Sequence, residues 1–294
     1  MIFKEKIEKA IKEKGVYFIA EIGQNHQGDI KIAKEMIDSL YGTGVCAIKT
    51  AKRDIETCLS DEQKNQIYDN PNSFGKTYYQ HRKALELSNS DFLELIRYSK
   101  KAGFDFISSF TDQISLAFLS QNNIDALKIA SQRLADIDLM KKTAKISLPI
   151  IISSGMSKIE EIELVLKIFE NNEKYLLQCT STYPCPIEEL DLNVIKTYIK
   201  KYSHKINGVG FSGHHTGIAS DIGAYMIGAK IIERHYTLDR SMKGNDHAGS
   251  LELKGIQNIL KYINQIKISL GSYEKKIHNS ELVALKKLRQ DLNG

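Results

Sequence analysis

Two histidines, His214 and His235, each stand near the end of a short apolar run of the kind that forms a β-strand. Glu233 precedes His235 by two residues, and because strand side chains alternate with period two, both should point the same way. If the two strands are parallel neighbours, both imidazoles lie at one edge of the sheet, about 5 Å of strand spacing apart. Neutral imidazoles so placed can bind a divalent metal ion, and the following loop adds Asp246 and His247. The alternative is two histidines that are hydrogen-bonded at strand ends and have only a structural role.

Polar residues also end the other strand-like runs, and most of them are lysines or carry hydroxyl groups. Along the chain they include Glu21, Lys49, Ser109, Lys128, Ser131, Ser153, Ser181, Tyr183 and Ser212. Buried lysines need anionic partners, and lysines combined with hydroxyls suit phosphate or carboxylate oxygens. The set therefore predicts a site for a small phosphorylated acid held near a divalent metal. For each lysine alone, an ion pair with a neighbouring glutamate is the alternative.

The elements that must position these residues are short apolar runs that alternate with helical patterns. The runs cover 16–23, 45–51, 104–110, 126–131, 149–155, 175–181, 208–213 and 230–237, and the helical patterns cover 30–40, 91–102, 113–120, 136–145, 158–171, 188–201, 218–227 and 254–270. Strands that are apolar throughout are typical of a parallel sheet buried on both faces. Such units over about 250 residues predict a (β/α)8 TIM barrel, here within residues 1–272, with its active site at the carboxyl ends of the strands. A doubly wound open sheet is the alternative, although no G-x-G-x-x-G motif follows the first run.

Composition narrows the class of protein. The 294-residue chain is 42% hydrophobic with a formal charge of +5, and its lysines are scattered along the helical segments. This suits attraction of small anions and gives little support to nucleic-acid binding. No apolar run approaches the ~20 residues needed to cross a bilayer, and the charged residues 1–15 predict a short amphipathic helix, not a signal peptide. The four cysteines form no C-x-x-C pair, so we expect reduced thiols and a cytoplasmic protein.

The connection between the second and third runs, residues 52–90, is long and lacks clean periodicity. Long connections in compact domains are usually functional or disordered. This one carries side chains that could close over a sugar by stacking and hydrogen bonding: Tyr68, Asn70, Asn72, Tyr78, Tyr79 and His81. A mobile surface loop is the alternative.

Several stretches together resemble one enzyme family. They are AEIGQNHQGD (20–29), KIAS (128–131), ISSGM (152–156), QCTSTYP (178–184), GFSGHHTG (210–217) and ERHYTLDRSMKGNDHAGSLE (233–252). In this order they resemble the sialic acid synthases, which join phosphoenolpyruvate to an N-acylhexosamine to make a nine-carbon keto sugar acid. Two forms, SGHHTG and SFGKTYYQH, are most similar to the animal-type branch, which acts on the 6-phosphate of N-acetylmannosamine.

The resemblance implies a role for each matching residue. Phosphoenolpyruvate would be held by Lys49, Ser109, Lys128, Ser131, Ser153, Ser181, Tyr183 and Ser212. His214 and His235 would bind one divalent ion, which is manganese by family habit, with magnesium or cobalt as alternatives. Glu21 and Asp246 would hold sugar hydroxyls, and Glu233 would move protons. The residues assigned to catalysis are Glu21, Lys128, Glu233 and His235.

Two positions depart from the family pattern. Ala51 stands where the family usually has the glutamine of Lys-x-Gln, and Arg133 stands where it usually has an acidic residue. Both changes concern the sugar more than phosphoenolpyruvate, and Arg133 is a candidate to bind a sugar phosphate or another acidic substituent. A synthase for another nonulosonic acid, of the legionaminic, pseudaminic or deaminated type, is therefore an alternative.

The C-terminal region is a third departure. Many relatives continue into an antifreeze-like domain, whereas here we expect only a basic tail at 273–294 after the barrel. Relatives form homodimers, and a homodimer of this chain would lack the support that the antifreeze-like domain gives there. The missing domain also motivates another alternative, a non-catalytic barrel subunit that binds phosphoenolpyruvate or a partner chain. Retention of the charged and imidazole set argues against it: Glu21, Lys49, Lys128, His214, Glu233 and His235.

Overall fold

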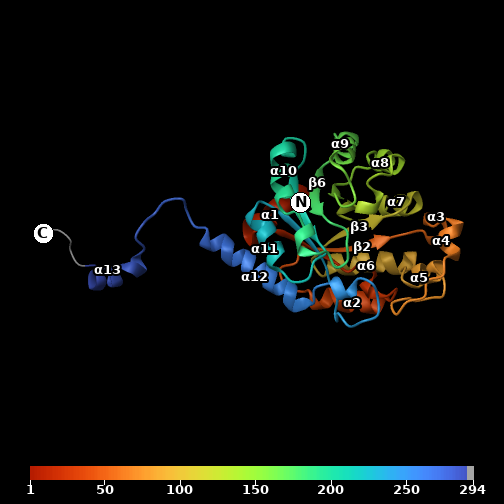
Figure 1. The fold of residues 1–294 in the computed structure, drawn as a ribbon, viewed down its shortest axis with the longest axis horizontal. Coiled ribbons are helices and arrows are strands. Elements are labelled where there is room, and N and C mark those ends of the chain that lie inside the picture. The colour runs from red at the N-terminus through yellow and green to blue at the C-terminus, as the bar shows by residue number, and fades with distance from the viewer. Residues whose placement is uncertain (290–294) are drawn as a thin grey trace.

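The computed structural model describes residues 1–289 and shows a closed barrel of parallel strands surrounded by helices (Figure 1). The strands follow one another around the barrel in chain order, from β1 to β8, and β8 pairs with β1. They are β1 (Tyr17–Glu21), β2 (Ala47–Lys52), β3 (Asp105–Phe110), β4 (Ala126–Ile129), β5 (Ile150–Ser153), β6 (Lys174–Cys179), β7 (Gly208–Gly213) and β8 (Ile231–His235). The predicted (β/α)8 barrel is confirmed, and the open doubly wound sheet is excluded because the sheet closes on itself.

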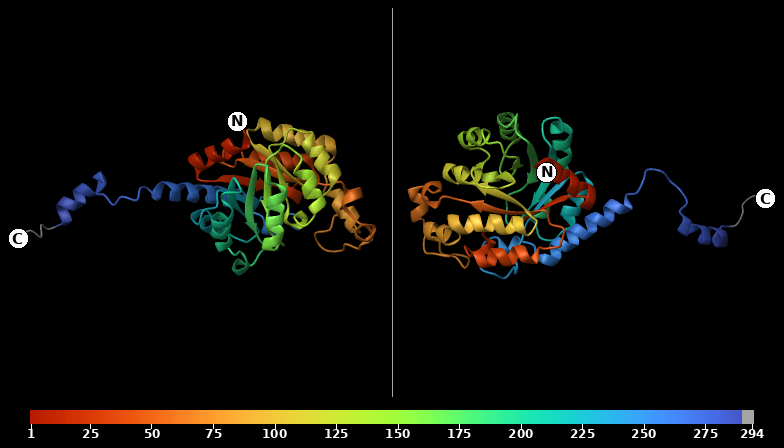
Figure 2. Two further views of the ribbon diagram at one scale, coloured as in Figure 1. Left: turned by 90° about the horizontal axis from the view of Figure 1, so that it is seen from above. Right: turned by 180° about the vertical axis from the view of Figure 1, so that it is seen from behind.

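One or more helices follow every strand and cover the outside of the barrel (Figure 2). They are α2 (Ile30–Ser39), α6 (Asn89–Lys101), α7 (Gln113–Ser120), α8 (Ile137–Thr143), α9 (Ile159–Ile168), α10 (Asn193–Tyr202), α11 (Ala219–Met226) and α12 (Leu253–Ser269). The predicted helix at 188–201 starts later than expected, at Asn193. Asp191 adopts a left-handed backbone with φ of 46°, which separates the short turn Ile187–Glu189 from α10.

The barrel interior is layered because strand side chains alternate between inside and outside. Toward the amino-terminal ends of the strands, which we call the lower end of the barrel, the inward residues are apolar: Tyr17, Ile19, Ala47, Ile107, Ala126, Ile151, Tyr175, Leu177 and Ile231. On β1, β2 and β4 the next inward residue, two positions further along, is charged: Glu21, Lys49 and Lys128. An apolar floor therefore carries a charged layer directly above it, toward the carboxyl ends of the strands.

Helix α1 (Phe3–Lys14) closes the lower end of the barrel, and it confirms the short amphipathic helix predicted for residues 1–15. Phe3, Ile7 and Ala10 lie on one face of the helix and are buried against the apolar interior layer. Phe3 packs edge-on against Tyr17 and Tyr175, with ring centroids 5.6 and 5.9 Å away. The barrel is therefore open only at the carboxyl ends of its strands.

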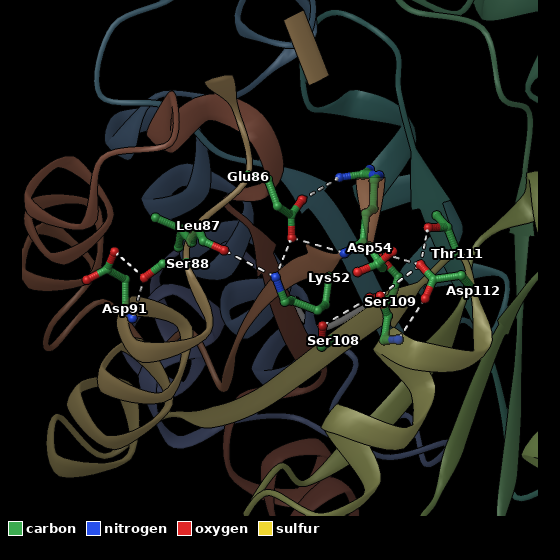
Figure 3. A network of polar contacts seen from close by, with 12 residues as sticks. Lys52, Asp54, Glu86, Leu87, Ser88, Asp91, Ser108, Ser109, Thr111 and Asp112 are labelled. Carbon is green, nitrogen blue, oxygen red and sulfur yellow. Dashed lines mark hydrogen bonds and ion pairs between the residues drawn. The ribbon is translucent and has the colours of Figure 1, made fainter. Parts of the chain in front are cut away.

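The long connection after β2 folds into the short helices α3 (Ile55–Cys58), α4 (Asp61–Asn65) and α5 (Tyr78–Ala84). Figure 3 shows how it is anchored: Lys52 Nζ donates to Glu86 Oε1 at 2.9 Å and to the Leu87 carbonyl oxygen at 3.1 Å. Nearby, the Asp54 backbone N–H donates to Asp112 Oδ2 at 2.9 Å. These bonds tie both ends of the segment to the barrel, so its base is fixed.

The chain leaves the barrel along α12, and α13 (Leu282–Leu288) lies away from the barrel in Figures 1 and 2. Of the tail predicted at 273–294, residues 290–294 lie outside the described residues. None of the helices within 1–289 combines the length and the apolar character that spanning a bilayer requires.

The packing of α1 predicts a large stability effect for one side chain. We expect Phe3→Ala to lower the free energy of unfolding by about 3–5 kcal/mol, because it leaves a cavity against two buried tyrosines. Ile2→Ala is the matched control, since Ile2 is 61% exposed, and should change little. Urea unfolding followed by circular dichroism measures both, and equal effects of the two changes would contradict the role of α1.

Candidate active site

The carboxyl ends of the strands surround a cavity of about 230 Å³. Its lining draws on all eight strands and the loops that follow them. The predicted site residues in it are Glu21, Lys49, Ser109, Lys128, Ser131, Ser153, Ser181, Tyr183, Ser212, His214, Glu233, His235 and Asp246. The structure thus brings together residues separated by more than half of the chain, whereas Arg133 does not belong to this lining.

Four buried charges form the base of the cavity. Lys49 pairs with Glu21, its neighbour across the β1–β2 register, and its Nζ lies 3.8 Å from Glu233 Oε1. Lys128 Nζ donates to Glu233 Oε1 at 3.1 Å and to Ser153 Oγ at 2.6 Å. Two cations and two carboxylates balance here, as they must where water is largely excluded.

The cluster sets the protonation of its members. Burial raises the pKa of Glu233, but the positive charges of Lys128 and Lys49 outweigh burial and bring that pKa below its ordinary value. Burial lowers the pKa of Lys49 to about 8, although Glu233 opposes this change. Glu233 is therefore an ionised carboxylate at neutral pH. Its Oε2 is buried and has no hydrogen-bond partner within the described chain, so this oxygen is free to accept a proton or a substrate hydroxyl.

Hydroxyl groups converge beside the charges, around Gly155. A Cβ atom at Gly155 would collide with Ser181 Oγ and come within 2.6 Å of Ser131 Oγ, so a side chain at this position would displace both hydroxyls. The Cys179 thiol lies 3.5 Å from each of the same oxygens. Hydroxyl donors gathered next to Lys128 form a lining suited to the oxygens of an anion.

The two histidines face each other above this layer. Their ring centroids are 5.3 Å apart, and Tyr183 lies 4.2 Å from His214 and 5.6 Å from His235. Nδ1 of His214 lies 3.1 Å from the Thr180 carbonyl oxygen, so a proton on Nδ1 leaves Nε2 free. Nδ1 of His235 is buried without a hydrogen-bond partner among the described residues and lies 3.9 Å from Asp246 Oδ2. Burial, reinforced by His214 and Lys49, lowers the pKa of His235 well below its ordinary value, so its imidazole is neutral.

These two imidazoles fit a divalent ion. A neutral ring with an unused buried nitrogen is what a metal ligand requires, and water or substrate oxygens can complete the coordination. Over residues 1–289, no three side chains of histidine, cysteine, aspartate or glutamate are grouped as a ligand set.

Behind the histidines, a buried ion pair joins β8 to α11. Arg234 pairs with Asp221, and neither side chain is more than 1% exposed. The Arg234 guanidinium also donates to the His215 carbonyl oxygen at 2.6 Å. Because Arg234 immediately precedes His235 and His215 immediately follows His214, this pair holds the two histidine-bearing segments together from the outside.

Four further residues of the cavity lining were not expected from the sequence: Gln24, Arg53, Gln132 and Met156. Arg53 follows Ala51 by two residues, so continued alternation beyond β2 is the signal that could have found it. The structure places Arg133 instead beside Asp136, with 3.9 Å between the charged groups, in a neighbouring hollow. Arg133 was a candidate because of its place in the family pattern, and the short turn Ser131–Arg133 after β4 carries its side chain away from the cavity lining.

The aromatic and amide side chains of the long connection also lie outside the cavity lining. Tyr68 Oη accepts from Asn245 Nδ2 at 2.8 Å, and Asn72 Oδ1 accepts from the Gly244 backbone N–H at 3.3 Å. These contacts brace the loop between β8 and α12, which carries Asp246. The connection therefore supports the rim of the cavity, and closure of its side chains over a sugar stays a prediction.

The fold and the site can be compared with known proteins. The NeuB family model matches residues 36–275. N-acetylneuraminate-9-phosphate synthase from Homo sapiens is 36% identical over 274 residues, which span 92% of this chain and 76% of that protein. N,N'-diacetyllegionaminic acid synthase from Campylobacter jejuni is 33% identical over 285 residues, 95% of this chain and 84% of that protein.

A solved structure is similar over nearly the whole chain. It is the N-acetylneuraminic acid (sialic acid) synthetase from Leptospira borgpetersenii, crystallised in complex with citrate. It is 30% identical, with a TM-score of 0.79, and the match covers 92% of this chain and 90% of that one. The likeness therefore extends over the whole barrel.

The buried pair behind the histidines predicts a strong effect on stability. We expect Asp221→Ala to lower the free energy of unfolding by about 3–5 kcal/mol, because it leaves the Arg234 charge buried and unpaired. Adding Arg234→Met should recover part of that loss, because the uncompensated charge is then gone. Denaturant unfolding of the single and double variants tests this, and a double variant less stable than the single one would contradict it.

Proposed function

The chain belongs to the NeuB family, and we propose that it condenses phosphoenolpyruvate with N-acetylmannosamine or its 6-phosphate. The products are N-acetylneuraminate or its 9-phosphate, together with inorganic phosphate. The observation that supports this best is a single cavity in which two lysines and a group of hydroxyls lie beside two histidines. The names of the human and Leptospira relatives correspond to these two products.

Phosphoenolpyruvate would occupy the base of the cavity. Lys49 and Lys128 would offset the charge of its phosphate and carboxylate. These substrate groups would replace the glutamate carboxylates that the two lysines now contact. The hydroxyl donors assigned to it are Ser109, Ser131, Ser153, Ser181, Tyr183 and Ser212. Because the strand ends already hold these groups in place, little reorganisation is needed as charge shifts during the reaction.

The sugar would lie nearer the mouth, with its aldehyde toward the histidines. His214 and His235 would hold a divalent ion, manganese in this proposal, with magnesium or cobalt as substitutes. When bound, such an ion supplies Lewis-acid polarisation of the aldehyde oxygen. Glu21 and Asp246 would accept hydrogen bonds from sugar hydroxyls and orient the aldehyde carbon.

The bonds change in two stages. A carbon–carbon bond forms between the methylene carbon of phosphoenolpyruvate and the aldehyde carbon, and the aldehyde oxygen takes up a proton. Water then adds to the carbon that bears the phosphate and loses one proton, which balances the proton taken up by the aldehyde oxygen. The hydroxyl group left on that carbon becomes the keto oxygen: its remaining proton leaves with the phosphate as the bond between the carbon and the phosphate oxygen breaks. Glu233 would accept the proton from water at its free Oε2, while Lys128 holds the other carboxylate oxygen 3.1 Å from its Nζ.

Phosphate release tests the proposed function. We expect release from phosphoenolpyruvate in the presence of manganese and either N-acetylmannosamine or its 6-phosphate, and loss of release when a chelator removes the metal. His235→Ala should reduce release by at least 100-fold, because it removes one of two metal ligands. Thermal unfolding verifies that the variant is folded. Binding of phosphoenolpyruvate without release in either mixture would reject this reaction.

The low pKa of Lys49 predicts the dependence of the reaction on pH. In the free enzyme, kcat/KM for phosphoenolpyruvate should fall as the pH rises through about 8, because Lys49 then loses the charge that binds the substrate. In Lys49→Arg the guanidinium stays protonated, so this decline should move to higher pH even if activity is lower overall. An unchanged position of the decline in the variant would assign it to another group.

A further inference from the structure

One side of the cavity carries a positive charge that the reaction described above does not use. Arg53 lines the cavity, and its side chain is only 15% exposed. Its nearest ion pair among residues 1–289 is a long one, 3.9 Å to Glu86 Oε2. The cations at the base differ, because each is in close contact with a carboxylate, Lys49 with Glu21 and Lys128 with Glu233.

Glu86 does not fully neutralise Arg53, because it is shared. Its Oε1 accepts from Lys52 Nζ at 2.9 Å, as Figure 3 shows, and from the Arg53 backbone N–H at 3.0 Å. One carboxylate therefore serves two cationic side chains. The guanidinium of Arg53 keeps donors that are not committed to a protein partner at hydrogen-bond distance.

A second guanidinium adds to the positive potential. Arg82 is 9% exposed, and within residues 1–289 no carboxylate lies at ion-pair distance from it. Its Nη1 donates to Gln24 Oε1 at 2.6 Å, and Gln24, like Arg53, lines the cavity. Burial, together with the charge of Arg53, lowers the pKa of Arg82 to about 10, so Arg82 is still protonated at neutral pH. The charge of Arg53 is thus close enough to Arg82 to be felt there, and an anion bound beside Arg53 would offset this repulsion.

We propose that Arg53, with the positive charge of Arg82 nearby, binds the phosphate group of an N-acylhexosamine 6-phosphate and makes the phosphorylated sugar the preferred acceptor. This inference rests on the proposed function. A phosphate monoester carries a charge near −2 at neutral pH and presents three acceptor oxygens, which match the planar donors of a guanidinium. Phosphoenolpyruvate carries the same chemical group, so the experiment must separate the two sources.

The test is the ratio of kcat/KM for N-acetylmannosamine 6-phosphate to kcat/KM for N-acetylmannosamine, measured at saturating phosphoenolpyruvate and manganese. In Arg53→Gln this ratio should fall about 10- to 100-fold, the range expected for loss of a charged hydrogen-bonded pair. Arg53→Lys should recover part of the ratio, because it restores the charge. In Arg133→Gln, the matched control, the ratio should stay within about twofold, because Arg133 lies outside the cavity lining.

Three outcomes would overturn the inference. The first is an equal loss of kcat/KM with both sugars in Arg53→Gln. The second is a rise in KM for phosphoenolpyruvate alone in that variant. The third is a ratio that falls in Arg133→Gln but not in Arg53→Gln. Direct binding of N-acetylmannosamine 6-phosphate, measured by calorimetry, does not depend on turnover. If the unaltered protein turns over neither sugar, the proposed function fails, but weaker binding in Arg53→Gln would still support the phosphate site and equal binding would overturn it.

Discussion

The buried cluster of Glu21, Lys49, Lys128 and Glu233 is the constraint on which the rest of the site depends. Buried charges that are excluded from solvent are tolerated only when charges of opposite sign compensate them. Compensation requires side chains from β1, β2, β4 and β8 to meet at one level of the barrel. The closed sheet and its register supply that level, with Glu21 opposite Lys49 on one side and His235 on the other. The charge balance is also what an anionic substrate would exploit, since it can replace a carboxylate as the partner of a lysine.

The histidines depend on a different kind of support. Inside the barrel they contact Tyr183 and each other, while outside it the Arg234–Asp221 pair holds the backbone segments that carry them. On β8, His235 thus faces the cavity, while its neighbour Arg234 faces outward and anchors the strand to α11. This division follows from strand alternation, because consecutive residues of β8 face opposite sides.

Sequence patterns predicted the barrel and most of the cavity lining, because both depend on period-two alternation in buried strands. The cavity lining differs from expectation just beyond the ends of two strands. Arg133 lies in a short turn just beyond β4 and points to a neighbouring hollow, whereas Arg53 continues the alternation of β2 for one step longer than expected. The partners of Arg234 could not be predicted either, because they depend on how α11 packs against the barrel and not on any local spacing.

The closed lower end of the barrel has a consequence for the order of events. Because α1 covers the floor, both substrates enter and both products leave through one mouth. A molecule bound at the base is covered by whatever binds above it, so the base must be filled first. If phosphoenolpyruvate occupies the base and the sugar the upper part, the kinetics follow a compulsory order, with the sugar as the second substrate to bind. By closing one end of the barrel, α1 thus determines the order in which the two substrates can bind at the other end.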